Sequence, residues 1–227
     1  PSVVPESDNC EAVENAVAVE GLRIAWQKHL ETVYDPGRPS LRELFSLRRH
    51  SRINHRLETL AGKRFSLHQT ETLIGAGGIF SHSSDTRVAW MLAEAFRPAG
   101  VTTLYLDTRF HSPHMGVLLS KHPEAALQYY SESCLKPVCR VLSPAWSTTG
   151  VFARVETPGG TKTVFTGDWL YLPSTGGCTL KVFGPSMKIP GNICDGLPLL
   201  IDCRRGETPL PMDFNRKFSV DTTGIRP

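Results

Sequence analysis

The sequence predicts an α/β protein in which a βαβ unit is followed by a β-rich module, and three observations predict it. Residues 70–75 (TETLIG) have the composition of a short buried strand, and glycines follow them. Residues 86–96 carry apolar side chains at helical spacing, and residues 101–107 (VTTLYLD) form a continuous apolar run. This order predicts a parallel, right-handed crossover in a covered sheet. Beyond residue 133, glycine and proline become frequent and the helical spacing disappears.

The amino-terminal part is expected to be helical. Asp8 and Asn9 are suitable caps for a helix that runs to about residue 34, with apolar side chains at helical spacing. A second helix is expected over residues 40–50, where a serine cap precedes a leucine-rich stretch. Residues 51–69 are polar and mixed, so both helix and loop stay open there.

The chain is expected to divide near residue 133. Residues 1–133 would form an α/β nucleotide-binding-like lobe with amino-terminal helices, and residues 134–227 a β-rich module. Short helices are expected at 113–120 and 123–130, each with proline near its start. The turn at Pro158-Gly159-Gly160 predicts a hairpin. The strands expected in the second part are residues 149–156, 162–166, 168–172, 178–183 and 197–202.

Composition excludes several classes of protein. The charges nearly balance, with 25 Lys and Arg against 22 Asp and Glu, and the single basic cluster at residues 48–56 is typical of a solvated face, so no nucleic-acid partner is expected. The six cysteines form no C-x-x-C pair, which argues against a zinc ribbon and favours reduced thiols in a cytoplasmic protein. No apolar run approaches the roughly 20 residues that span a bilayer, so no membrane contact is expected. Self-association stays open.

One segment indicates ligand binding, LIGAGGIFSH at residues 73–82. Glycines at the carboxyl end of a buried strand let the backbone approach a ligand closely, and open α/β sheets bind ligands at that edge. The segment lacks the third glycine of G-x-G-x-x-G and the Gly-Lys-Ser/Thr of a P-loop. A tight strand-to-helix turn without a ligand is the equally weighted alternative.

Four ordered stretches carry a resemblance to a known family. They are LIGAGGIFSHSSDTRVAWMLAEAFRPAGVTTLYLD (73–107), SPHMGVLL (112–119), HPEAALQYYSESCL (122–135) and GLPLLIDCRRGETPLPMD (196–213). Together they resemble the GlmL-type accessory proteins of adenosylcobalamin-dependent glutamate mutase, also called MutL and unrelated to the mismatch-repair protein of that name. The resemblance extends over about residues 40–218. The I-G-x-G-G pattern also resembles the adenosine-contacting loop of the actin, heat-shock chaperone and sugar-kinase ATPase superfamily.

The resemblance implies a partial actin-like, ribonuclease H-like lobe in a nucleotide-dependent chaperone or reactivase that services the mutase. ATP or ADP with Mg²⁺ would lie between two lobes, and Gly77 and Gly78 would pass beneath the nucleotide. The other implied cofactor-binding residues are Gly75, Ser81, His82 and Asp107. Asp107 has an equally weighted alternative role as a cap for the next turn.

The chain also departs from the family pattern. The superfamily uses an Asp-x-Gly-[Ser/Thr] phosphate loop, and the sequence contains none, so we expect no ATPase activity from this chain alone. The chain begins at Pro1 without an initiator methionine, which we interpret as a carboxyl-terminal fragment or one subunit of a split protein. The partner would then be the mutase or the missing amino-terminal lobe. Cys203 and Glu207 stand where the family has Ala and Pro.

Two functions of other classes stay open beside this one. The first is a structural protein-interaction domain that binds no ligand. The second is a small metal-dependent enzyme that uses Asp107, His111 and His114, although a capping or surface role for the histidines is favoured. Asp202, Arg204 and Arg205 follow a predicted buried strand, and an ion pair among them is favoured over a phosphate site.

Overall fold

A computed structural model describes residues 8–33, 70–144, 149–183 and 193–204 together with the single residues 189, 210 and 212. The helix expected at residues 40–50, the mixed stretch 51–69 and the basic cluster lie outside the described residues. No helix in the described ranges is both long enough and apolar enough to cross a membrane.

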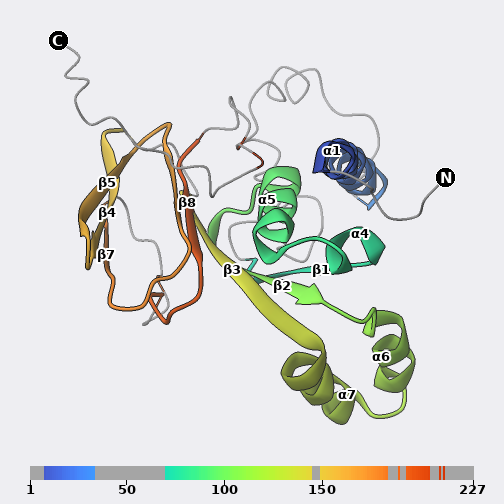
Figure 1. Ribbon diagram of the computed structural model, residues 1–227. Helices are drawn as coiled ribbons and strands as arrows, with labels where there is room; N and C mark the ends of the chain where they lie inside the picture. The colour runs from blue at the N-terminus through green and yellow to red at the C-terminus, as the bar shows by residue number, and fades with distance from the viewer. Residues whose placement is uncertain are drawn as a thin grey trace, which may run out of the picture.

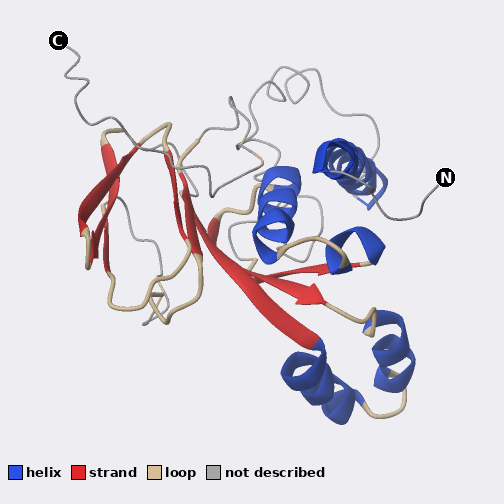
Figure 2. Cartoon of the chain, in the orientation of Figure 1, coloured by secondary structure: helices blue, strands red, loops and turns tan. Residues whose placement is uncertain are grey.

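The order of helices and strands agrees with an α/β protein (Figure 2). The first half contains α1 (Asp8–Val33), β1 (Thr72–Ala76), α4 (Gly78–Ser81), α5 (Asp85–Phe96), β2 (Gly100–Asp107), α6 (Ser112–Leu119), α7 (Pro123–Tyr129) and the π-helical turn η2 (Tyr130–Cys134). The second half contains β3 (Leu135–Ser143), β4 (Val151–Thr157), β5 (Gly160–Phe165), β6 (Trp169–Leu172), β7 (Thr179–Val182) and β8 (Leu199–Asp202).

The expected βαβ unit is confirmed. Strands β1 and β2 pair in parallel, and α5 connects them through a crossover. They begin a five-stranded sheet of order β1-β2-β3-β8-β6, which lies beside a three-stranded sheet of order β5-β4-β7 (Figure 1). The expected hairpin is also present, because β4 and β5 pair in antiparallel fashion and Thr157 lies opposite Gly160.

The sequence did not predict β3, the middle strand of the large sheet. It pairs with β2 in antiparallel fashion and with β8 in parallel fashion. Its pairing with β2 is irregular at Pro137, because Leu104 faces Cys139 while Tyr105 faces Pro137. Proline has no N–H for a ladder and lowers the strand signal of its surroundings, and a β-bulge is where a sheet accommodates it.

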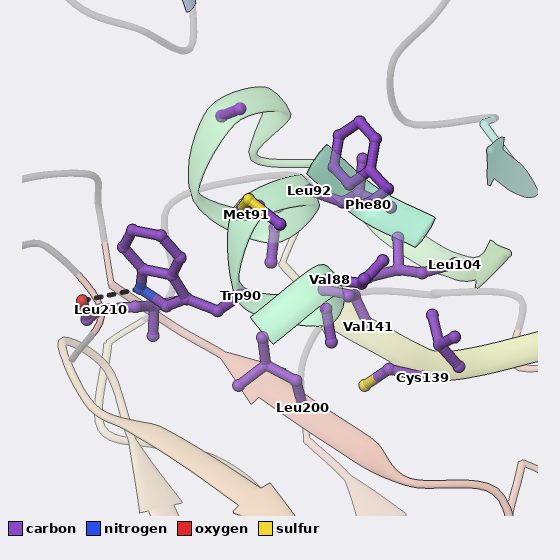
Figure 3. Packing of buried hydrophobic residues seen from close by; sticks show 14 of the residues in the cluster. Phe80, Val88, Trp90, Met91, Leu92, Leu104, Cys139, Val141, Leu200 and Leu210 are labelled. Carbon is purple, nitrogen blue, oxygen red and sulfur yellow. Dashed lines mark hydrogen bonds between the residues drawn. The ribbon is translucent and has the colours of Figure 1, made fainter. Parts of the chain in front are cut away.

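The large sheet separates two hydrophobic cores. On one face α5 packs over the strands, with Met91 and Leu92 fully buried, and Figure 3 shows them in one cluster with Leu104 and Leu200. On the other face Leu199 and neighbouring side chains pack against the three-stranded sheet. Neighbouring residues of β8 belong to different cores because successive side chains of a strand point to opposite faces.

The arrangement is therefore layered, with α1 on α5, α5 on the large sheet and the small sheet on the far face (Figure 1). Trp26 of α1 lies edge-on to Phe96 of α5, with ring centroids 5.6 Å apart. The boundary predicted near residue 133 falls just before β3, and the large sheet takes strands from both sides of it.

Candidate functional site

The candidate site lies where β1 and β2 end. The two strands are parallel and in register, with Ala76 opposite Asp107, so both following loops leave the same edge of the sheet. Between these loops is an open pocket of about 400 Å³, which is within the size range of small-molecule sites. Its lining is Gly77, Gly78, Ser81, Asp107, Thr108, Arg109 and Phe110.

The glycine loop forms one wall of this pocket. Gly77 has φ 111°, a conformation that side chains rarely adopt, so glycine is needed for the turn out of β1. Gly78 has an ordinary φ, and a Cβ added to it would meet no atom within 4 Å. The backbone at Gly77 and Gly78 is therefore bare toward the pocket, as the ligand-binding prediction requires.

The other glycine-loop residues have different positions. Ser81 lines the pocket, and its hydroxyl donates a hydrogen bond to the Gly78 carbonyl oxygen at 3.2 Å. His82 ends α4, is exposed and does not line the pocket. Gly75 is buried inside β1, where an added Cβ would lie 3.2 Å from Cγ of Phe80. Its lack of a side chain serves the packing of Phe80 and Leu92 against the strand.

The carboxylate of Asp107 is bound by its own loop. The backbone N–H groups of His111 and Ser112 donate to it at 2.9 and 2.7 Å, and the Ser112 hydroxyl donates at 2.6 Å. Burial would raise the pKa of Asp107, but the hydrogen bonds from Ser112 and His111 outweigh burial and hold the pKa at about 2. The side chain is 0% exposed, so Asp107 shapes the pocket wall and caps the start of α6.

The sequence did not indicate the second wall, Thr108–Phe110. Phe110 is the notable member, because a bulky residue with φ 56° lies in the left-handed region. Such a conformation costs about 1–3 kcal/mol and is concentrated at functional sites. The sequence signal that could have indicated this wall was its position, because residues 108–110 directly follow the carboxyl end of the predicted strand 101–107.

The structure does not support the metal-dependent alternative. Nδ1 of His111 lies 3.4 Å from the Asp107 carboxylate, and His114 is exposed on α6. Within the described ranges no group of three His, Cys, Asp or Glu side chains is arranged to hold a metal ion. Asp107 and His111 are therefore parts of a helix cap.

The ion pair expected after the strand is confirmed for Asp202 and Arg204, and Arg205 lies outside the described residues. The Arg204 guanidinium donates to both carboxylate oxygens of Asp202, at 2.9 and 2.7 Å, and to Glu94 at 3.1 Å. These groups are buried under α5 and away from the residues that line the pocket. A phosphate role for Arg204 therefore has no support in the geometry.

Comparison with protein families identifies the chain. The model of the family described as MutL protein matches residues 1–134, which is more than half of the chain. The chain belongs to this family. The MutL match includes both walls of the pocket, which are the glycine loop and Thr108–Phe110. It agrees with the resemblance of the ordered motifs to glutamate mutase accessory proteins. It ends at β3, so the motif at 196–213 lies outside it.

No curated protein and no solved structure gives a significant match to this MutL-family chain.

Proposed function

We propose that this MutL-family protein is a nucleotide-binding module of a chaperone-like ATPase that services a cobalamin-dependent mutase. ATP or ADP would bind in the pocket between the loops that follow β1 and β2. The observation that carries the proposal is the bare glycine backbone at the carboxyl edge of a parallel strand pair, with a pocket directly above it. Membership of the family supports the accessory role.

The composition of the pocket is consistent with an anionic, partly flat ligand. Arg109 contributes a positive charge to the lining, and the carboxylate of Asp107 stays ionised but is buried and accepts hydrogen bonds from Ser112 and His111. The glycine backbone allows a ligand to approach the peptide without meeting a Cβ atom. These features fit a nucleotide better than a neutral, bulky ligand.

A magnesium ion held by the pocket itself does not fit this lining. Mg²⁺ is usually bound through one or two carboxylates together with phosphate oxygens. Asp107 is the only carboxylate among the residues that line the pocket, and its oxygens accept the hydrogen bonds from His111 and Ser112. We therefore give the ion no role in the proposed binding of nucleotide by this chain.

Titration calorimetry with ADP tests the proposal, with Gly78→Leu as the variant. We expect weak binding by the natural chain and none by Gly78→Leu, because the added side chain would project into open space above the loop. Gly116→Leu on α6 is the matched control, since Gly116 also has an ordinary φ and nothing within 4 Å but lies outside the pocket lining. It should bind ADP like the natural chain.

Two results would overturn the proposal. One is the absence of both heat and a thermal shift when ADP is added to the natural chain. The other is equal affinity in the Gly78→Leu and Gly116→Leu variants, which would place the nucleotide elsewhere.

The second candidate function is a protein-interaction domain without a ligand, and one observation favours it. Helix α6 has no buried residue, and Val117 is 72% exposed. Leu118 and Leu119 are also exposed on the same helix, which extends from the end of the sheet beside α7 (Figure 1). Exposed apolar helices commonly mark contacts with other proteins. This surface would suit the mutase or another lobe, and it is compatible with a nucleotide in the pocket.

A further inference from the structure

Phe110 combines an unfavourable backbone conformation with an exposed aromatic ring. Its φ of 56° places a bulky side chain in the left-handed region, and 53% of the residue is exposed to solvent. Burial of the ring elsewhere would relieve the exposure, and glycine at this position would relieve the backbone. The chain keeps the exposed ring at this strained position, where it is accessible to a ligand.

The ring borders the same pocket as the glycine loop. Phe110 and Arg109 lie on one wall, and Gly77 and Gly78 lie on the other, because β1 and β2 end in register. A Cβ added to Gly77 or Gly78 would meet nothing within 4 Å, so the space over this loop is not filled by the protein's side chains. An aromatic side chain and bare peptide that line one pocket are suited to a flat ring.

We propose that Phe110 is the surface on which the base of the bound nucleotide stacks. This inference rests on the proposed nucleotide function and names the residue that would hold the base. Stacking on an aromatic ring uses the π-face that every base has, so it adds affinity with little selection between bases. ADP and GDP should therefore bind with similar affinity, and pyrophosphate, which has no base, should gain nothing from the ring.

The test compares three variants by titration with ADP and with pyrophosphate. Phe110→Ala keeps the backbone but removes the ring, and we expect it to weaken ADP binding on the order of 10-fold without a change for pyrophosphate. Phe110→Trp should keep ADP affinity, and its indole emission should be quenched by the stacked base. Phe165→Ala is the matched control, since Phe165 is 49% exposed on β5 and does not line the pocket.

The outcomes separate this inference from the proposed function. Binding of ADP by the natural chain with equal affinity in Phe110→Ala would overturn the stacking role and leave nucleotide binding intact. Equal losses for ADP and pyrophosphate in Phe110→Ala would also overturn it, because the ring would then act on the phosphates or the fold. No quenching in Phe110→Trp despite ADP binding would contradict stacking even if Phe110→Ala failed to fold. No ADP binding by the natural chain would overturn both proposals.

Discussion

Glu94 of α5 and Arg204, which follows β8, form an ion pair of 3.1 Å although they lie 110 residues apart in the chain. Both side chains are only 2% exposed. Burial would raise the pKa of Glu94, but the backbone N–H of Leu210 and the guanidinium groups of Arg97 and Arg204 lower it overall. The pair therefore connects the helical layer to the segment that directly follows β8 through two buried charges.

Replacement of Glu94 by Gln should be strongly destabilising. It would leave the buried Arg204 and the partly exposed Arg97 with less compensation, and breaking a buried ion pair typically lowers the free energy of unfolding by about 3–5 kcal/mol. Urea denaturation measures the change. Lys136→Met is the control, because Lys136 pairs with Asp85 at the surface and such pairs contribute at most about 1 kcal/mol. Similar urea midpoints for the two variants would contradict the expected difference.

The stability of the protein should depend on Asp107 at low pH. The pKa of Asp107 falls from an ordinary 3.8 to about 2 on folding, because hydrogen bonds from Ser112 and His111 outweigh the effect of burial. A lowered pKa gives stability that is present above about pH 4 and is lost as the pH falls through about 2.

The free energy of unfolding of Asp107→Asn should therefore lie below that of the natural chain at pH 6. The gap should narrow as the pH falls from about 4 to about 2. Urea unfolding over pH 2–6 would check this expectation, and Ser112→Ala should show a smaller gap with the same trend. A gap that stays constant over this range would contradict it.

Cys139 should be unreactive in the folded protein. Its thiol is buried in β3, and burial raises its pKa to about 12 from an ordinary 9.0, so the thiolate at pH 8 is roughly 1000-fold scarcer than in an ordinary cysteine. Cys10 on α1 is exposed and should react readily. Alkylation with iodoacetamide followed by peptide mass spectrometry measures both rates. Rapid labelling of Cys139 without denaturant would show that β3 opens easily.

Substitution by alanine should change the stability of the protein at Gly75 but hardly at Gly78. At Gly75 the new methyl group would lie 3.2–3.3 Å from Phe80 and Leu92 in the core, so we expect a loss of about 1–3 kcal/mol in the free energy of unfolding. At Gly78 nothing lies within 4 Å, and the change should stay within about 0.5 kcal/mol. Thermal and urea unfolding of both variants would check this, and equal losses would contradict the packing role of Gly75.

Local patterns predicted much of the fold. The helix expected at 86–96 is α5 (Asp85–Phe96), and the strand expected at 101–107 is β2 (Gly100–Asp107). The strand β3 escaped prediction because Pro137 interrupts its pattern and a bulge, which depends on the partner strand, restores the pairing. The π-helical turn η2, which directly precedes β3, was likewise not expected.

In the candidate site too, the sequence predicted one part and missed another. The glycine loop was visible in the sequence because φ 111° at Gly77 needs a glycine, and glycine is itself a sequence signal. The second wall at Phe110 was not visible, because its residues are ordinary and become neighbours of the loop only through the register of β1 and β2. The sequence alone also left Asp107 open between ligand and cap, and the hydrogen bonds of Ser112 decided its capping role.

The sequence by itself therefore determined the α/β class, the βαβ unit, the glycine loop and the motifs of the MutL family. These depend on the conformational preferences of residues close together in the chain. Only the tertiary structure decided the place of β3, the burial of the Glu94–Arg204 pair and the second wall of the pocket. Each of these depends on which distant segments pack together, and packing is a property of the whole fold.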